Sequence, residues 1–241
     1  MVRPLARASL LVRRDVTLGT LMDRLARIHG GRRLVEEEGG ATRTYEEAAE
    51  QVRRWAGAIA ARTSPGDVVV VNTPNGYDML LLCLAAARAG CLPAPVNDQM
   101  RAEEVAHVVA DSAATLVVRS PAELDGAEPL ADAHPAEPGE VGALFYTSGT
   151  TGAPKGVELT HRALVGQVLA AVAWPNVLRC DEAVIALPVA HIMGFVVLLG
   201  LAAAGVPTYL LSRFHPVRVL DAIESRRATI HIGVPAMYRM L

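Results

Sequence analysis

The sequence predicts an α/β fold built from βαβ units with largely parallel sheets, and two observations predict it. The first is a continuous β-branched run, Val68–Val71, which is typical of a strand that is covered on both faces. The second is the alternation that follows, in which apolar segments of strand length are separated by segments of helix length. Because parallel strands need crossover connections of that length, the order of the segments favours a parallel sheet.

The clearest helix of the first half is predicted for TRTYEEAAEQVRRWAGAIAA, residues 42–61. Thr44 and Glu47 form a capping-box pattern, and apolar residues then recur at helical spacing. After the strand at 68–71, the pattern predicts a helix near 77–89, a strand near 92–96, a helix near 102–111 and a strand at 115–118. The stretch RRLVEEEGG, residues 32–40, is interpreted as a charge-paired hairpin on the solvated surface.

A connector rich in Pro, Ala and acidic residues, 120–140, is interpreted as a surface loop between two α/β portions, 1–119 and 141–241. The second portion is predicted to contain strands at 143–147, 183–187, 206–211 and 229–232, and helices near 161–173, 192–204, 216–224 and from 234. The chain stops inside the predicted second turn of the last helix, so we expect this portion to be incomplete.

Residues 183–212 carry no charged side chain, and their length alone would allow a membrane span. Prolines and glycines such as Pro188, Gly194 and Pro207 divide the stretch into shorter pieces. We therefore expect a buried strand, helix and strand here, and no transmembrane segment.

Composition excludes some classes of function. A net charge of −2 argues against a nucleic-acid-binding protein, which would show a basic face. The three cysteines, Cys83, Cys91 and Cys180, fit neither a disulfide framework nor the spacing of metal ligands. A reducing cytoplasm is the location that this usage favours, with self-association left open.

The stretch YTSGTTGAPKG, Tyr146–Gly156, contains the single lysine of the chain, Lys155, among glycines and hydroxyls. Glycines let backbone N–H groups approach an anion closely, and hydroxyls add further donors. A lysine ammonium adds a compact charge where an arginine would bring a wide planar fork. The candidate phosphate-binding residues are therefore Thr147, Ser148, Gly149, Thr150, Thr151, Gly152 and Lys155.

Two alternatives remain at this point, a plain flexible turn and a lysine placed by chance. The spacing does exclude a Walker A loop, because Pro154 stands where that motif needs its second glycine and Gly156 follows the lysine. His107 and Asp111, one helical turn apart, are a conceivable metal pair, but no third ligand is near in sequence. We interpret them as a solvated polar pair, and we expect no metal site within the chain.

The loop strongly resembles the phosphate-binding core motif of the adenylate-forming (ANL) superfamily, which includes AMP-dependent acyl-CoA synthetases and fatty-acid–CoA ligases. The early Tyr-Glu helix of residues 42–61, the stretch 84–118 and LPVAHIMGF at 187–195 are similar to further motifs of that family in the same order. This resemblance implies the fold of the N-terminal domain of acyl-CoA synthetases, here incomplete.

The resemblance also implies a two-step reaction. A carboxylate attacks the α-phosphate of MgATP to give an acyl-adenylate and pyrophosphate, and the thiol of the co-substrate CoA then displaces AMP. The family would use the loop around Lys155 for the β- and γ-phosphates. His191 would lie beside the carboxylate or the thioester path, or it is simply a histidine at a helix start. The acyl group is expected to be fatty or otherwise apolar.

The family's Mg²⁺-holding glutamate, its ribose-binding aspartate and its C-terminal catalytic lysine have no counterpart in these 241 residues. We therefore expect the isolated chain to be inactive, and Lys155 is not that catalytic lysine. A non-catalytic paralogue that binds a phosphate ligand or a partner is the alternative. An amino-acid-activating domain is disfavoured, because 187–195 carries no acid for a substrate ammonium.

Overall fold

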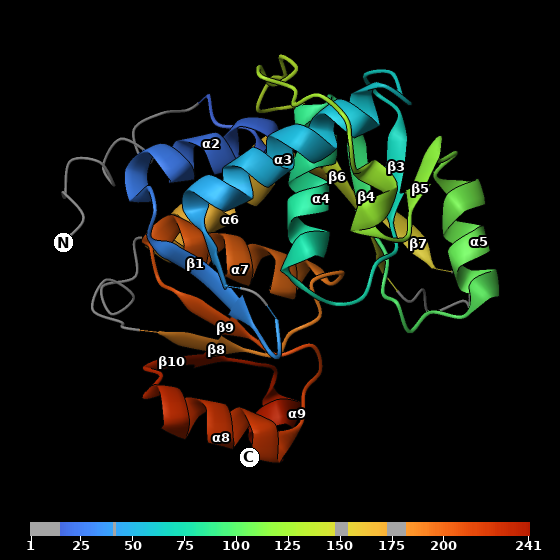
Figure 1. Ribbon diagram of the computed structural model, residues 1–241. Helices are drawn as coiled ribbons and strands as arrows, with labels where there is room; N and C mark the ends of the chain where they lie inside the picture. Colours follow the sequence, from blue (N-terminus) through green and yellow to red (C-terminus); the bar gives the residue numbers. More distant parts are fainter. Residues whose placement is uncertain (1–14, 41, 148–153, 173–181) are drawn as a thin grey trace.

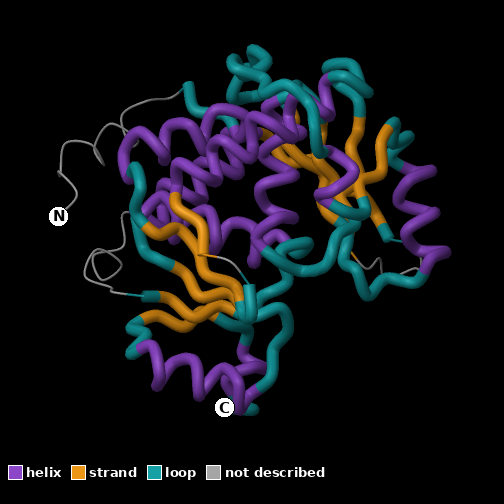
Figure 2. Tube along the Cα trace, in the orientation of Figure 1, coloured by secondary structure: helices purple, strands orange, loops and turns teal. Residues whose placement is uncertain are grey.

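The computed structural model describes residues 15–40, 42–147, 154–172 and 182–241 (Figure 1). Within these ranges the strands form a five-stranded sheet, a three-stranded sheet and a two-stranded hairpin. Helices lie against both sheets and between them (Figure 2). All strand pairs of the two sheets are parallel except one, so the predicted α/β class with largely parallel sheets is confirmed.

The five-stranded sheet combines strands from both ends of the chain. Its order is β10 (Ile230–Ile232), β8 (Ala183–Ile185), β9 (Thr208–Leu210), β1 (Arg33–Glu37) and β2 (Thr42–Thr44). β1 pairs in parallel with β9 and antiparallel with β2, so it lies inside the sheet. The interpretation of residues 32–40 as a solvated hairpin is therefore wrong in part. The hairpin exists, but Leu34 and Val35 are buried, because β1 lies inside the sheet and both side chains belong to the main hydrophobic core.

Two layers of helices enclose this sheet. α8 (Pro216–Arg226) and the single turn α9 (Pro235–Tyr238) lie on one side, and α7 (Ile192–Ala204) lies on the other (Figure 1). α7 is buried along most of its length between the sheet and α6 (His161–Val172). The predicted strand, helix and strand in residues 183–212 are thus confirmed. Within the described residues, no helix has the length and apolarity needed to cross a membrane.

The three-stranded sheet has β3 (Val68–Val71) at its centre, between β4 (Leu92–Pro95) and β5 (Leu116–Val118). All four valines of β3 are buried, as the unbroken β-branched run predicts. Val69 and Val71 face the core with α4 (Tyr77–Arg88), whereas Val68 and Val70 face α5 (Ala102–Asp111). Alternate residues of one strand therefore fill two cores.

The helices α2 (Leu18–His29), α3 (Tyr45–Ala60) and α4 pack on one another, and α4 also packs against β3 and β4 of the three-stranded sheet (Figure 1). α3 begins at the predicted capping box, since the Thr44 side chain accepts from the Glu47 N–H and the Glu47 carboxylate accepts from the Thr44 N–H. α2 was not predicted from the sequence. Its first turn holds no acidic residue, and the side chain that accepts from the Thr17 N–H is Thr20 rather than the usual Glu or Gln, so its start carries a weak sequence signal.

Part of the connector is fastened to these helices. The buried guanidinium of Arg88 donates to the carbonyl of Leu130 at 2.9 Å, to that of Ala131, and to the carboxylate of Asp23 at 2.7 Å. Most connector side chains are exposed, although Leu124 of the short 3-10 helix η1 (Pro121–Leu124) is buried. The division into portions 1–119 and 141–241 stays a prediction, and strands from both sides of it share the five-stranded sheet.

Candidate functional site

The predicted phosphate-binding loop connects the two strands of a hairpin. β6 (Val141–Thr147) pairs antiparallel with β7 (Lys155–Thr160), and Thr147 lies directly opposite Lys155. The two described ends of the loop are thus adjacent. The other candidates, Ser148, Gly149, Thr150, Thr151 and Gly152, lie outside the described residues.

The strand β7 was missed at the level of sequence. Val157 and Leu159 alternate with Gly156, Glu158 and Thr160, which is the period-2 pattern of a strand. The glycine-rich loop directly before this pattern makes it easy to assign residues 155–160 to the loop as well. Read as a strand, the pattern predicts a hairpin whose two strands are joined by that loop.

The side chain of Lys155 is exposed, as is the whole first part of β7. Of the ion pairs formed by the described residues, none includes Lys155. An exposed ammonium group can offer its donors to a ligand or to water. The geometry is therefore compatible with the predicted contact to an anion.

The hairpin and the LPVAHIMGF segment meet in the core. The ring of Phe145, two residues before Thr147 on β6, packs edge-to-face on the ring of Phe195 with 5.3 Å between centroids. Both rings are buried. An edge-to-face pair of this kind holds the end of β6 against the first turns of α7. Two motifs separated in the sequence are thereby brought together.

His191 is the N-cap residue of α7. Its Nδ1 accepts a hydrogen bond from the Met193 N–H at 3.2 Å, and its side chain is exposed. Because Nδ1 accepts, the neutral ring carries its proton on Nε2, which faces away from this contact. The residue thus has a capping role, and its place beside an acyl or thioester group stays a prediction.

Asn75, in the loop after β3, joins three strand ends. Its Oδ1 accepts from the Val189 N–H at 2.7 Å, and its Nδ2 donates to the Ser212 carbonyl at 2.9 Å. Val189 follows β8 and Ser212 follows β9. Asn75 therefore supports the backbone from which His191 projects.

The helix α5 contacts the hairpin through two polar side chains. The hydroxyl of Tyr146 donates to the Asp111 carboxylate at 2.8 Å, and the Nε2 atom of His107 lies 3.0 Å from the carbonyl oxygen of Pro154. Burial, together with the bond to Asp111, raises the pKa of Tyr146 to about 12, so its hydroxyl stays a donor at neutral pH. The interpretation of His107 and Asp111 as a solvated pair is therefore wrong in part. Asp111 is exposed and His107 is half-buried, but Asp111 bonds to Tyr146 on β6 and His107 bonds to Pro154, the residue before β7.

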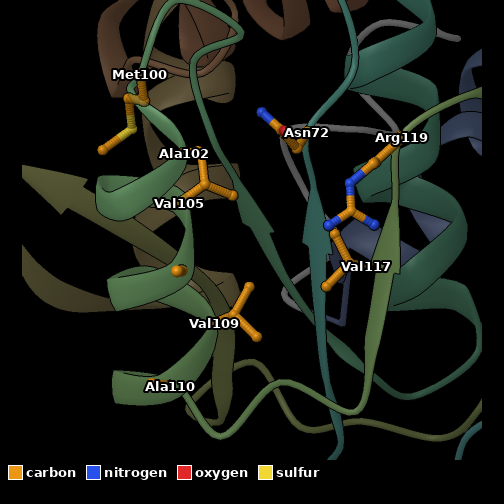
Figure 3. Close-up of a pocket in the computed structure, with 9 residues that line it drawn as sticks. Asn72, Met100, Ala102, Val105, Val109, Ala110, Val117 and Arg119 are labelled. Carbon is orange, nitrogen blue, oxygen red and sulfur yellow. The ribbon is translucent and has the colours of Figure 1, made fainter.

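The opposite flank of α5 borders a pocket of about 520 Å³, between the helix and the strands β3 and β5 (Figure 3). Apolar side chains of α5 and β5 line most of it, with the amide of Asn72 and the guanidinium of Arg119 at one end. Along this pocket, the side chains of α5 are exposed or only partly covered by the rest of the protein. Fewer packing contacts therefore hold the helix in place.

These elements define an α/β protein whose glycine-rich hairpin is locked to the start of a buried helix. A family model for the AMP-binding enzyme matches residues 22–241. A feruloyl-CoA synthase of Amycolatopsis sp. is 32% identical over 225 residues, which is 84% of this chain and 46% of the relative. The chain belongs to the family of AMP-binding enzymes, and its relatives place it in the adenylate-forming superfamily.

Further comparisons agree on the extent of the match. A long-chain-fatty-acid–CoA ligase of Mycobacterium tuberculosis is 28% identical over 240 residues, covering 86% of this chain and 47% of the ligase. The crystal structure of ATP-bound MatB from Rhodopseudomonas palustris superposes with a TM-score of 0.82 at 26% identity, over 93% of this chain and 50% of that one. The chain therefore spans about half the length of the curated relatives it matches.

Proposed function

We propose that this chain supplies the ATP phosphate-binding part of an AMP-forming acyl-CoA synthetase. The reaction joins a carboxylate to the AMP part of ATP with release of pyrophosphate, and CoA then takes the acyl group as a thioester. The single observation that carries the proposal is the hairpin. It sets Thr147 opposite Lys155 at the two ends of a loop rich in glycine and hydroxyls, in a chain whose relatives are CoA ligases.

The chemistry of the hairpin fits a polyphosphate. The Lys155 ammonium, exposed and outside every ion pair among the described residues, would bind the terminal phosphates as charge builds on the leaving pyrophosphate. The Thr147 hydroxyl would donate at the other end. Mg²⁺ would enter with ATP and neutralise phosphate charge, since it binds chiefly through substrate phosphates and one or two protein oxygens.

The acyl substrate that we propose is a carboxylic acid with an apolar body, fatty or aromatic. Support comes from the named relatives, which include a feruloyl-CoA synthase, a 4-chlorobenzoate–CoA ligase and a long-chain-fatty-acid–CoA ligase. The proposal includes His191 as the residue nearest the carboxylate or thioester, because α7 is apolar and its exposed N-cap residue offers a polar group at the start of the helix. The reducing cytoplasm stays part of the proposal, with Cys83 and Cys91 as buried free thiols.

Thermal-shift titration of the chain with ATP, pyrophosphate and AMP tests the nucleotide-binding part. A ligand that binds only the folded state raises the melting temperature with concentration. We expect a rise with magnesium pyrophosphate and ATP and little or none with AMP, because the hairpin addresses the terminal phosphates. No rise with either polyphosphate up to millimolar concentration would refute the proposal.

Pyrophosphate release from ATP in the presence of a panel of carboxylates tests the second part. The expected result for the 241-residue chain is binding without turnover, since the family's catalytic lysine and Mg²⁺-holding glutamate have no counterpart in it. Release that depends on an aryl or fatty acid would extend the proposal to a complete active site. If the chain binds polyphosphates but releases no pyrophosphate, it is either one part of a synthetase or a non-catalytic paralogue. Adding the remaining half of a relative, and measuring pyrophosphate release again, distinguishes these two alternatives.

A further inference from the structure

The helix α5 reaches the hairpin at two points that flank the predicted phosphate loop. Asp111 accepts from the hydroxyl of Tyr146, the residue before Thr147, and His107 bonds to the carbonyl of Pro154, the residue before Lys155. Because the Pro154 oxygen can only accept, the imidazole carries a proton on Nε2. One face of α5 therefore contacts both ends of the loop. Each contact is made to the residue just before a predicted phosphate-binding residue, Thr147 at one end and Lys155 at the other.

The apolar packing of α5 is too thin to fix the helix by itself. The structure describes every residue of α5, and Val108 is the one that is buried. On its other flank Val105 and Val109 border the open pocket (Figure 3). With so little buried surface, the two polar contacts contribute a large share of what keeps α5 and the hairpin in register.

The motif glycine after Lys155 makes room for this arrangement. A β-carbon built on Gly156 would lie 3.1 Å from Cζ of Tyr146 and 3.2 Å from its hydroxyl oxygen. Tyr146 and Gly156 are direct cross-strand partners, so the Tyr146 ring lies over Gly156, and its hydroxyl reaches Asp111 beyond it. A side chain at position 156 would press on the ring whose hydroxyl makes the contact.

We propose that His107 and Asp111 are positioning residues for phosphate binding, acting through Pro154 and Tyr146 to hold the paired residues Lys155 and Thr147 in place against α5. This inference rests on the proposed function of the hairpin. A loop whose two ends are held in place loses less conformational freedom when a ligand binds, so its affinity is higher. Neither side chain needs to touch the ligand.

The test uses magnesium pyrophosphate as the probe and two readouts on the whole chain. Calorimetry gives the dissociation constant, and hydrogen exchange by NMR gives the protection of the amides of residues 145–147 and 155–157. His107→Ala and Asp111→Ala are each expected to weaken binding about fivefold and to speed exchange by a similar factor, the worth of one typical hydrogen bond.

Conservative variants distinguish the loss of the hydrogen bond from the loss of the side chain as a whole. His107→Gln keeps an N–H donor and Asp111→Asn keeps an acceptor, so both are expected to stay within about twofold of the wild type. Glu103→Ala, an exposed site on the same helix, is the matched control and should leave both readouts unchanged. If Asp111→Ala fails to fold, Tyr146→Phe removes the hydroxyl alone and tests the same contact.

The two readouts distinguish the failure of this inference from that of the proposed function. If the wild type binds no polyphosphate, the proposed function fails, and with it the role in binding. If the wild type binds, and the alanine variants speed exchange but bind as tightly as Glu103→Ala, the contacts are structural only and the inference is overturned. Unchanged exchange and unchanged affinity together would also overturn it.

Discussion

The helix α4 and the hairpin β6–β7 each carry a cationic side chain, which is buried in α4 and exposed in the hairpin. Arg88, at the end of α4, is 1% exposed, and its guanidinium is shared between the Asp23 carboxylate and backbone carbonyls. Lys155, at the start of β7, is exposed and joins no ion pair among the described residues. The buried cation stabilises the fold, whereas the exposed one is available for the phosphate contact that we propose.

The largest effect expected from this contrast is the loss of Arg88. Arg88→Met keeps much of the side-chain volume but leaves the carbonyls of Leu130 and Ala131 without their donor, while Asp23 keeps its ion pair with Arg53. A buried acceptor left without its donor costs about 1–3 kcal/mol of unfolding free energy, and two carbonyls lose theirs here. Urea-induced unfolding followed by circular dichroism measures it.

The control for that change is Arg54→Met. Arg54 pairs with Glu50 one turn away on the exposed surface of α3, and such pairs contribute about 0–1 kcal/mol. A loss of under 1 kcal/mol in Arg88→Met, equal to that of the control, would show that the buried network is not what fastens the connector to the helices.

A second comparison uses two helical glycines, one beside the site and one away from it. A β-carbon on Gly194 in α7 would lie 2.1 Å from the carbonyl oxygen of Pro188, which is too close for any real contact. Gly166 in α6 has no heavy atom within 4 Å of the same position. We expect Gly194→Ala to lose about 1–3 kcal/mol through overpacking. Gly166→Ala should gain about 0.5–1 kcal/mol from helix propensity.

Thermal melts of both glycine variants measure the two changes in stability. The Gly194→Ala result also reports on the candidate site, because a shift of Pro188 would move the segment that carries His191. If Gly194→Ala were as stable as Gly166→Ala, the tight packing of α7 against the 187–191 segment would be contradicted.

The smallest stability effect concerns His161, which lies where the exposed hairpin enters the core. Its Nδ1 accepts from the Leu18 N–H at 3.3 Å, and burial lowers the pKa of His161 below its ordinary value. The unfolded chain therefore binds a proton on this group at a higher pH than the folded protein does. It follows that stability is lost as the pH falls below about 6.5, by at most about 1.4 kcal/mol per pH unit.

His161→Asn retains an acceptor for the Leu18 N–H but cannot titrate. The unfolding free energy of the wild type should therefore decline more steeply than that of the variant between pH 7 and 5. Parallel curves for the two proteins would mean that His161 is protonated in the folded state as easily as in the unfolded one.

The sequence was a good guide wherever a pattern was local. The helices α3, α4, α5, α7 and α8 and the strand β3 lie close to their predicted positions, because periodicity and caps are written in neighbouring residues. β1 was misjudged because its charged ends suggested a surface, whereas pairing with β9, far along the chain, places it inside the sheet and its apolar residues in the main core. Pairing between distant segments leaves no local pattern to read.

The same limit applies to the site. The glycine-rich loop and the 187–195 segment could be named from their residue types, but their contact through Phe145 and Phe195 could not. His107 and Asp111 were correctly placed on one helical face, and their partners Pro154 and Tyr146 were not foreseen. Which surface a helix face meets depends on how the sheets stack, and that is decided by the whole chain.

Calorimetric titration of magnesium pyrophosphate into the wild type and Lys155→Ala tests the central claim most directly. An exposed, unpaired side chain contributes little to the fold, so the variant should unfold within about 0.5 kcal/mol of the wild type. Its affinity for pyrophosphate should fall tenfold or more, since a charge-assisted contact contributes about 1.5–3 kcal/mol. Equal affinities, or a variant that loses several kcal/mol of stability, would contradict the claim that this ammonium is reserved for a ligand.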